Sequence, residues 1–350
     1  MGNICTWCMF PNNYYKSTHQ TKMLNETQHN IQVTQPSRHI EMDPVCLQKQ
    51  LGTGYSANIW LGTQGNKYVV VKKYKKTEDK KFTQHCMMES KVLYRCQHPN
   101  IVSCLGTKNT GIIVVEDKEN IQHYVDPNED FLLLEYCALG DMYQLLEEQP
   151  QQMIPSERML RGLVKPVVVA LQYALEQGVS HRDIKLENLF IDANGIIKVG
   201  DWGLSTLHRH SKRSAGTLGY MAPEMVCRQQ YCANKVDTWA VGVLLFSLCN
   251  GTRPYGEPKA RKKHPADDSW KDEWLSAMLN QKWRLWWLSH ARVTPQVGKM
   301  SEPLCDLIQH MLDPDPNLRL STAQILAHPW MNDPDIATAK EIVELKSKKN

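Results

Sequence analysis

The spacing of apolar residues changes once along this chain, near residue 135, and this change constrains the fold most strongly. Before it, short runs such as NKYVVVKKYKK (66–76) and FLLLEY (131–136) predict strands, interrupted by one helix near 80–97. After it, apolar residues recur with helical spacing. We therefore predict an α+β protein with two lobes: a small β-rich lobe with one main helix, and a larger, mainly helical lobe.

Two helices of the larger lobe are predicted in detail. In residues 156–178 an apolar stripe follows Ser156, a good N-cap, and ends before Gly178, a good helix stop. Pro166 lies inside this helix and should kink it. Residues 235–251 are apolar nearly all round, which predicts a buried helix.

The predicted organisation has three parts and no internal repeat. A ligand cleft is expected between the two lobes of the folded part. The parts are a polar segment with no sustained apolar period (1–44), a folded domain (45–330, with small lobe 45–134, connector 135–140 and large lobe 141–330) and a tail (331–350).

Composition narrows the class of protein. The chain has 350 residues with 41 basic and 37 acidic side chains, a mild excess that predicts no nucleic-acid partner. Its 11 cysteines follow no regular framework, so we read them as reduced thiols in the cytoplasm. The longest apolar run (239–249) is too short to span a bilayer. Oligomeric state is not predicted.

Two features of the small lobe suggest phosphate binding, each weakly. Gly52 and Gly54, in LGTGYSANIW (51–60), would let the backbone turn tightly near a phosphate, although such a pair is more often a hairpin turn. Lys72 ends an apolar strand. If it faces inward it needs an anionic partner, either Glu89 in the following helix or a phosphate.

Residues 180–190 (SHRDIKLENLF) place two acids, two bases and an imidazole beside apolar flanks. The cluster is either a solvated turn or a site that faces a reactant. On the second reading, Asp183 would take a proton from a hydroxyl, Lys185 would neutralise a phosphate, and Asn188 would hold a metal ion. Asp201 follows a β-run, and Mg²⁺ prefers carboxylate and phosphate oxygens together.

The order of these motifs resembles the eukaryotic-type protein kinase family, serine/threonine branch, from about Leu51 to Trp330. The series contains Gly52/Gly54, Lys72, Glu89 with HPNIV (98–102), EYCALGDM (135–142), HRDIKLEN (181–188), DWG (201–203), GTLGYMAPE (216–224), VDTWAVGVLLF (236–246) and DPDPNLRLSTAQILAHPW (313–330).

The resemblance implies a two-lobed kinase fold, ATP and Mg²⁺ as cofactors, and protein substrates. Lys72 would hold the ATP phosphates and pair with Glu89, Asp183 would be the catalytic base, and Lys185 would touch the transferred phosphate. Asn188 and Asp201 would bind Mg²⁺. The nucleotide would lie among Leu51, Gly52, Thr53, Gly54, Tyr55, Ser56, Ala57, Ile59, Val70, Leu134, Phe190 and the backbone of Glu135 to Cys137.

Further structural and regulatory roles follow from the resemblance. Glu224 and Arg319 would form a structural ion pair, and Asp237 would brace the catalytic loop. Arg182 would face a phosphate on the activation segment (201–224), where Ser214 lies close to Thr217 of the GT pair. The basic loop residues near Ser214 would help to hold such a phosphate. The alternative is an unmodified loop with constitutive activity.

The acceptor is predicted to be serine or threonine, because Lys185 and Thr217 match that branch. Asp141 and Glu187 fall where basophilic kinases place acids for a substrate arginine, so we predict an arginine upstream of the target residue; two ordinary surface acids are the alternative. Ala57, Val70 and Trp202 depart from the usual glycine, alanine and phenylalanine. None of these changes removes a catalytic group.

The N-terminus MGNICTWC fits a myristoylation pattern on Gly2. A single myristoyl chain binds membrane only marginally, so a second signal is needed, from palmitoylation of Cys5 and Cys8 or from the basic stretch 72–81. With these acyl groups, the protein would act at the cytoplasmic face of a membrane. An exposed, unmodified tail is the alternative. The tryptophan-rich region 256–300 predicts packing within the large lobe, with a docking surface as the alternative.

We therefore predict an active serine/threonine kinase that transfers the γ-phosphate of ATP to proteins. The main rival is a pseudokinase scaffold, which the presence of Lys72, Glu89, Asp183, Asn188 and Asp201 disfavours. A small-molecule or lipid kinase would not need GTLGYMAPE, which shapes a peptide platform in protein kinases.

Overall fold

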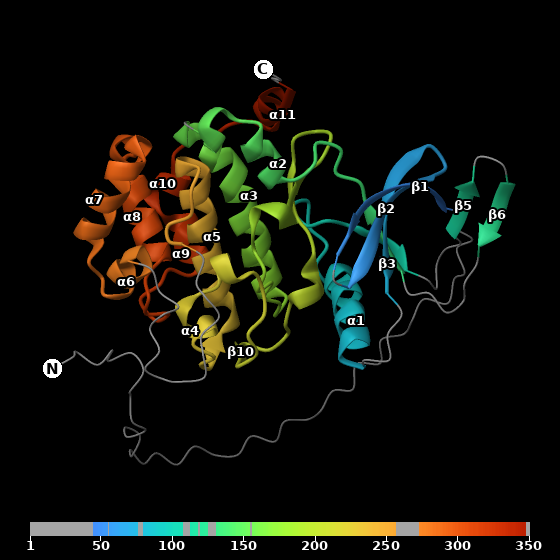
Figure 1. Ribbon diagram of the computed structural model, residues 1–350, viewed down its shortest axis with the longest axis horizontal. Coiled ribbons are helices and arrows are strands. Elements are labelled where there is room, and N and C mark those ends of the chain that lie inside the picture. The colour runs from blue at the N-terminus through green and yellow to red at the C-terminus, as the bar shows by residue number, and fades with distance from the viewer. Residues whose placement is uncertain are drawn as a thin grey trace, which may run out of the picture.

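The computed structural model describes residues 45–54, 56–75, 80–107, 113–117, 120–124, 131–154, 156–256 and 273–347. They form two lobes, with the sheet and α1 at one end and the helices α2 to α11 at the other (Figure 1). The two-lobed α+β prediction is confirmed. Four residues predicted to act lie outside the described part: Gly2, Cys5, Cys8 and Tyr55.

The small lobe is one sheet with the strand order β4-β7-β3-β2-β1-β5-β6. Its strands are β1 (Val45–Thr53), β2 (Ala57–Gln64), β3 (Lys67–Tyr74), β4 (Cys104–Thr107), β5 (Ile113–Asp117), β6 (Asn120–Tyr124) and β7 (Phe131–Glu135). Alternate side chains of β3 face opposite sides of the sheet. Val69 and Val71 join a small buried cluster with Leu133, so the next residues, Val70 and Lys72, face the other way.

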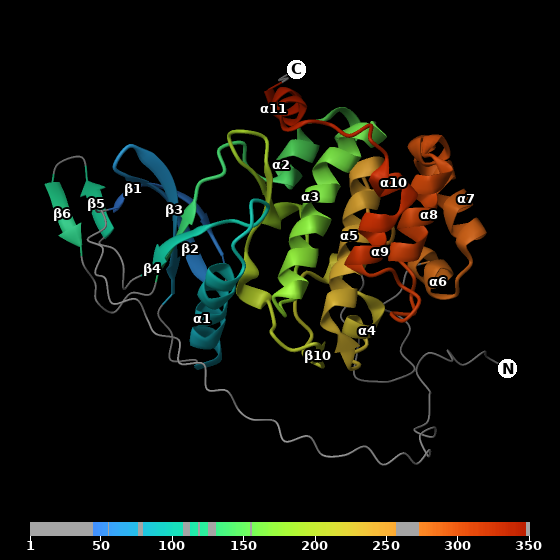
Figure 2. The ribbon, with the colours of Figure 1, turned by 180° about the vertical axis from the view of Figure 1, so that it is seen from behind.

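The helix α1 (Lys80–Arg95) packs against the sheet lobe and reaches toward the large lobe (Figure 2). Its last turns are held by Val92 and Leu93, which belong to the core of the large lobe. The helix therefore connects the two cores. This matters for the site because α1 carries Glu89.

The large lobe is built around α3 and α5. α3 (Glu157–Glu176) begins after Ser156, which accepts a hydrogen bond from the Met159 amide, and ends before Gly178 at φ 71°. Both predicted boundaries are confirmed, and the helix continues through Pro166. α5 (Ala233–Asn250) is buried from Val236 to Asn250, as its composition predicted.

The remaining elements of this lobe surround α3 and α5. The helices are α2 (Met142–Glu147), α4 (Pro223–Val226), α6 (Glu273–Leu279), α7 (Trp283–Val293), α8 (Glu302–Met311), α9 (Thr322–Ala327), α10 (Pro329–Asn332) and α11 (Ala339–Ser347), with short strand pairs β8 (Leu189–Ile191) and β9 (Ile197–Val199), and β10 (His210–Ser211) and β11 (Tyr231–Cys232).

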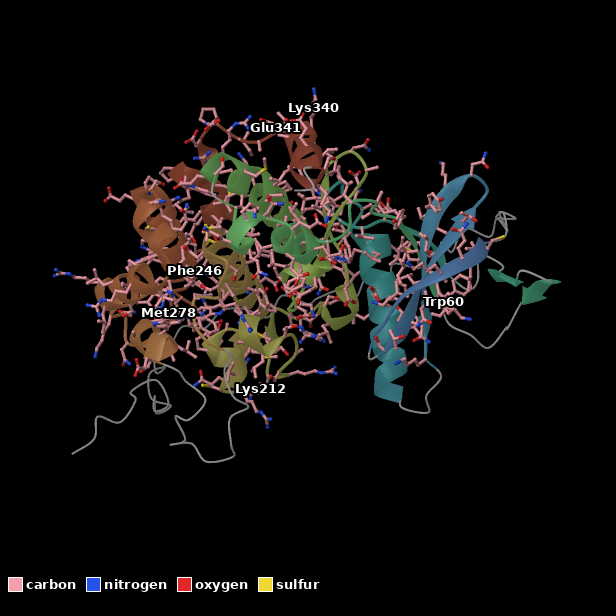
Figure 3. The ribbon with its side chains drawn as sticks, turned by 45° about the horizontal axis from the view of Figure 1, so that its top comes forward. Trp60, Lys212, Phe246, Met278, Lys340 and Glu341 are labelled. Carbon is pink, nitrogen blue, oxygen red and sulfur yellow. The ribbon has the colours of Figure 1, made fainter. Side chains whose placement is uncertain are left out.

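Aromatic residues fill the space between α5, α6 and α7. Phe246 and Met278 are labelled at this end of the lobe in Figure 3, and the Phe246 ring centroid is 5.2 Å from that of Trp286. Trp286 is fully buried and donates to the Pro254 carbonyl at 3.1 Å. The prediction that the tryptophans pack this lobe is confirmed for these helices, while Trp270 lies outside the described part.

The C-terminal residues pack against the domain. Arg158 of α3 makes a two-bond ion pair with Glu341 of α11, with N–O distances of 2.5 and 2.9 Å. A Cβ added at Gly162 would lie 2.8 Å from the Ala337 carbonyl oxygen, so glycine allows this approach. Ile342 of α11 is buried. Within the residues described, no helix is both long and apolar enough to cross a bilayer.

Candidate active site between the two lobes

Lys72, Glu89 and Asp201 meet between the lobes. Lys72 Nζ lies 3.0 and 2.8 Å from the two carboxylate oxygens of Glu89 and 2.8 Å from Asp201 Oδ1. β3 supplies the lysine, α1 supplies Glu89, and the turn after β9 supplies Asp201. Glu89 is 1% exposed, so its charge is balanced inside the protein. Of the two partners proposed for Lys72, the structure identifies Glu89 and adds Asp201.

Lys72 and its two carboxylate partners, Glu89 and Asp201, stabilise one another in their charged forms. Burial alone would lower the pKa of Lys72, but the carboxylates of Glu89 and Asp201 outweigh burial and raise that pKa above its usual value. Burial would raise the pKa of Asp201, and the Lys72 ammonium lowers it instead. Asp201 has φ 54°, the left-handed conformation that aspartate tolerates better than most residues.

Tyr74 is a second partner of the Glu89 carboxylate, besides Lys72, and the sequence analysis missed it. Its hydroxyl donates to Glu89 Oε2 at 2.8 Å. Tyr74 lies two residues after Lys72 on β3, so both side chains project from the same face of the strand. That two-residue spacing was the signal available in the sequence.

Asp183 is the centre of a second cluster, in the loop before η3 (Leu186–Asn188). Its Oδ1 accepts hydrogen bonds from the Thr217 amide and from the Thr217 hydroxyl, both at 2.8 Å. Its Oδ2 lies 3.2 Å from Lys185 Nζ and 3.3 Å from Asn188 Nδ2. Lys185 also donates to Thr217 Oγ1 at 2.9 Å. The loop that carries Asp183 and Lys185 is therefore in direct contact with Thr217 of the activation segment.

The loop that carries Asp183 is fixed from below by Asp237 of α5. The Asp237 carboxylate accepts from the amides of His181 (2.8 Å) and Arg182 (2.6 Å). Burial raises the pKa of Asp237, and the nearby His181 and the two amide donors oppose that rise. The predicted bracing role of Asp237 is confirmed geometrically. It also stabilises the left-handed backbone of Arg182, which has φ 70°.

One face of the sheet would border the nucleotide. Ile59 pairs with Lys72, and Val70 pairs with Leu134, so cross-strand register places these four side chains on one face. Ile59, Val70 and Leu134 are each half-buried. From the large lobe, Phe190 approaches so closely that a Cβ at Gly200 would meet its ring at 2.7 Å. Gly200 was not predicted, and it brings the ring beside Asp201.

The glycine turn connects β1 and β2. Its residues Leu51, Gly52, Thr53 and Gly54 are exposed, Ser56 is half-buried and Ala57 is buried. The Gly54 amide donates to the Ala57 carbonyl at 2.8 Å, which closes the turn. A Cβ at Gly52 would meet no protein atom within 4 Å. The turn is thus a hairpin, and it leaves open space where a phosphate would approach.

The connector between the lobes begins at Glu135. The Glu135 amide donates to the Ser103 carbonyl at 3.1 Å. Glu135 Oε1 accepts from the Ser103 amide (2.7 Å) and from Lys198 Nζ (2.9 Å). Cys137 is 9% exposed, and burial raises the pKa of its thiol to about 12, so it stays protonated.

Asn188 and Asp201 fit a site for Mg²⁺ that phosphate oxygens complete. The Asn188 side-chain nitrogen donates to the Asp183 carbonyl at 2.8 Å, so its amide oxygen remains for another partner. The Asp201 side chain is 46% exposed, although its Oδ1 contacts Lys72. Among the described residues, no three His, Cys, Asp or Glu side chains gather as a metal site. Mg²⁺ commonly needs only one or two protein ligands besides phosphates.

Trp202 replaces the usual phenylalanine and lies under α1. It is fully buried, donates from Nε1 to the Val199 carbonyl at 3.1 Å, and has its ring centroid 4.5 Å from that of His181. The predicted change in packing is therefore an added hydrogen bond. Phenylalanine has no N–H group to make it.

The activation segment is held by Arg182, but not at Ser214. The Arg182 guanidinium donates to the carbonyls of Leu204 (2.8 Å) and Ser205 (3.2 Å), and its Nη1 lies 3.4 Å from both Ser211 Oγ and the Tyr231 hydroxyl. Ser214 is exposed, and its hydroxyl lies 3.8 Å from Met221 Sδ. Thr217 belongs to the Asp183 cluster described above.

Two other predictions concern acidic residues of the large lobe. Arg319 and Glu224 form a buried two-bond ion pair at 2.7 and 3.0 Å, as predicted. Asp141 caps α2 by accepting from the Gln144 amide at 2.8 Å, so one of its oxygens is already used. Burial raises the pKa of Asp141. Glu187 is exposed.

Comparison with known proteins agrees with this geometry. The protein kinase domain family model matches residues 46–331. The chain is 32% identical over 314 residues to the SNF-related serine/threonine-protein kinase of Rattus norvegicus, which covers 87% of this chain and 36% of that protein. It is 29% identical over 262 residues to NUAK family SNF1-like kinase 2 of Homo sapiens, covering 73% and 35%.

These relatives are longer proteins, and the chain spans only about a third of each. Members of the matched family use ATP and Mg²⁺, and the residues present at the site fit both. With the fold, the order of the motifs and the matched range in agreement, the chain belongs to the protein kinase domain family.

Proposed function

We propose that this chain is an active serine/threonine protein kinase that transfers the γ-phosphate of ATP to protein hydroxyl groups. The observation that supports it most strongly is the assembled site: Lys72 contacts both Glu89 and Asp201, and Asp183 contacts Lys185, Asn188 and Thr217. A pseudokinase scaffold would not need both clusters intact. Of the two relatives named above, one is a serine/threonine-protein kinase by its name and the other is a kinase by its name.

The residues divide the work of phosphoryl transfer, which depends on positioning and charge more than on covalent chemistry. Lys72, held by Glu89, would bind phosphate oxygens of ATP. Asp183 would orient the acceptor hydroxyl and receive the proton of that hydroxyl, since Asp183 Oδ1 already accepts a hydrogen bond from the Thr217 hydroxyl. Lys185, 3.2 Å from Asp183 Oδ2, would neutralise charge on the transferred group. Mg²⁺ held by Asn188 and Asp201 would supply further charge neutralisation.

Phosphate transfer from labelled ATP and Mg²⁺ to an arginine-containing serine peptide tests the proposal. Wild type is compared with Asp183→Asn, which keeps the shape and removes the negative charge. We expect transfer by the wild type alone. If neither protein transfers phosphate while ATP binds, the chain is a scaffold. If both transfer equally, Asp183 is not the base.

We propose a substrate preference for arginine upstream of the target residue, read by Asp141 and Glu187. Glu187 is exposed, and Asp141 lies at the N-cap of α2, where its Oδ1 accepts from the Gln144 amide. A peptide array in which arginine-free peptides react equally would remove this preference. Double substitution of Asp141 and Glu187 by asparagine and glutamine should flatten the preference without lowering activity on arginine-free peptides.

We propose regulation by phosphorylation of the activation segment. Ser214 is the acceptor suggested by the sequence, and Ser211 is the acceptor favoured by the contacts of Arg182. A phosphate on Ser211 would meet the Arg182 guanidinium directly and lie near the Arg213 amide, which donates to Ser211 Oγ at 3.1 Å. Because Arg182 already holds two loop carbonyls, we expect measurable activity before any phosphorylation.

We propose that the protein acts in the cytoplasm at a membrane surface, attached by acylation of Gly2 and of Cys5 or Cys8. One myristoyl chain gives an association constant of only roughly 10⁴ M⁻¹, so the attachment needs a second contribution. Membrane fractionation of wild type and Gly2→Ala in cells tests the attachment. Unchanged fractionation of the variant would refute it.

A further inference from the structure

α7 (Trp283–Val293) presents an outward face that mixes large apolar and basic side chains. Leu285, Leu288 and Val293 are 54, 51 and 63% exposed, so three exposed apolar side chains lie on one helix. Arg284 and Arg292 are exposed on the same helix. Since an α-helix advances by about 100° per residue, Arg284, Leu285, Leu288 and Arg292 fall within about 100° of arc.

The inward face of α7 is firmly anchored. Trp286 and His290 are fully buried, and both bond the Pro254 carbonyl, at 3.1 and 3.0 Å. Trp287 donates to Gln309 Oε1 of α8 at 3.4 Å. The helix is therefore held in place, and its exposed leucines are not needed for packing.

The stretch of sequence that carries α7 has basic side chains and no acidic ones. Between Glu273 and Glu302 the sequence contains no aspartate or glutamate. The same stretch contains four basic side chains, all exposed: Lys282, Arg284, Arg292 and Lys299. Within the part of the chain that the structure describes, none of these four makes an ion pair. A partner of complementary charge must therefore be anionic.

We propose that the outward face of α7, together with Lys282 and Lys299, binds the surface of a membrane that contains anionic phospholipid. Leu285 and Leu288 would enter the headgroup region, and the basic residues would contact lipid phosphates. A bilayer accepts exposed leucines on a convex helix without a shaped groove, which favours it over an acidic protein surface. This inference deepens the proposed membrane attachment, since it supplies the second contribution that one acyl chain requires.

The position of α7 suits this role. α7 lies at the end of the molecule opposite the sheet lobe in both views (Figures 1 and 2). Binding through α7 would keep Lys72 and Asp183 away from the bilayer, and the cleft would remain open to ATP and protein substrates.

The test uses the full chain made in bacteria, where Gly2 carries no acyl group, so that only the protein surface contributes. Cosedimentation is measured with phosphatidylcholine vesicles, with and without phosphatidylserine. We expect binding only when phosphatidylserine is present. Arg284→Gln/Arg292→Gln should weaken it about thirty-fold, since each basic residue near an anionic surface contributes about five-fold. Leu285→Gln/Leu288→Gln should weaken it as well.

The matched control is Lys67→Gln/Lys340→Gln, which removes two exposed charges away from α7. Lys340 lies on α11 at another edge of the large lobe (Figure 3). We expect this control to bind as wild type does. Equal loss in the control, undiminished binding of the arginine variant, or binding only to an acidic peptide or a nucleic acid would overturn the proposal.

Peptide phosphorylation in solution, without vesicles, is measured on the same variants. It should be unchanged, because α7 lies outside the catalytic site. Vesicle binding without phosphotransfer by any variant would refute the kinase proposal and leave this one standing. Phosphotransfer without vesicle binding would do the reverse.

Discussion

The Tyr74 hydroxyl donates a 2.8 Å hydrogen bond to Oε2 of Glu89, the carboxylate that also contacts Lys72. The tyrosine and the lysine come from one strand and the glutamate from α1, so this bond fixes the helix relative to the sheet. Because Glu89 accepts from both Tyr74 and Lys72, we expect it to keep its position when Lys72 contacts a phosphate of the nucleotide.

Removing this hydroxyl should impair catalysis more than stability. We expect Tyr74→Phe to lower kcat/KM for ATP about tenfold, because a hydrogen bond to a charged group contributes about 1.5–3 kcal/mol. The effect should appear mainly in KM for ATP, since Lys72 binds phosphate. Steady-state kinetics over a range of ATP concentrations measure this.

The matched control is Tyr68→Phe, on the same strand. Tyr68 is 57% exposed, and the same single oxygen is removed. Unaltered kinetics in this control and a changed KM in Tyr74→Phe would assign the effect to Glu89. Equal changes in both proteins would argue against it.

The choice between Ser211 and Ser214 can be decided by mutation. After incubation with ATP, we expect Ser211→Ala to lose most of the stimulation seen in wild type, because Ser211 Oγ lies 3.4 Å from Arg182 Nη1. Ser214→Ala should retain it. Mass spectrometry of the loop and initial rates before and after incubation give the answer. Full stimulation in both variants would end the switch hypothesis.

Arg319 should be among the most costly residues to replace. It is fully buried beside Glu224, and its guanidinium lies 4.9 Å from the Trp239 ring centroid. Arg319→Met leaves the Glu224 charge buried and unpaired, which should lower the free energy of unfolding by about 3–5 kcal/mol. Urea denaturation measures the loss. Lys346→Ala, which breaks a partly exposed pair with Glu148, should lose no more than about 1 kcal/mol.

The residues after 331 should contribute to stability although they lie beyond the matched family range. Ile342→Ala should lower the free energy of unfolding by about 2–5 kcal/mol, since that side chain is buried against the core. Lys340→Ala, two residues earlier and exposed, is the control. An Ile342→Ala protein as stable as wild type would mean that α11 is loosely attached.

The contribution of Lys72 to nucleotide binding should be flat across a wide range of pH. The raised pKa of Lys72 means that its contribution to folding stability is complete below the unfolded pKa of about 10.4. That contribution is lost only at higher pH. The pKa of Asp201 is lowered, so its contribution to folding stability is lost only in acid, as the pH falls below the unfolded pKa of about 3.9. The ratio of dissociation constants for Lys72→Met and wild type, measured by nucleotide fluorescence, should be constant between about pH 5 and 9. A ratio that varies within this range would contradict the pairing.

The change in apolar spacing near residue 135 was enough to predict the two lobes, and the order of motifs was enough to predict most of the candidate site. Lys72, Glu89, Asp183, Asn188 and Asp201 were each identified from the sequence. The structure brings them into two clusters, one of Lys72 with Glu89 and Asp201 and one of Asp183 with Asn188. These residues follow local patterns that a strand, a loop or a turn imposes. The helix limits at Ser156 and Gly178 were predictable for the same reason.

The contacts that were missed depend on segments distant in the chain. Lys72 and Asp201 are 129 residues apart, and no local pattern shows that the lysine has two carboxylate partners. Arg182 reaches Ser211 because β10 pairs with β11, a register that the loop sequence does not reveal. Gly200 was overlooked since its role is the space it leaves for the Phe190 ring.

The Glu135 carboxylate has a mechanical consequence for the whole molecule. It joins the Ser103 amide, in the sheet lobe, to Lys198, on β9 of the large lobe, at the start of the connector. Because Glu135 is bonded to both lobes, we expect the connector to keep its position when the angle between the lobes changes. Opening of the lobes should then displace the glycine turn, which lies farther from the connector, while the adenine edge near Glu135 hardly moves. Nucleotide would enter and leave beneath that turn.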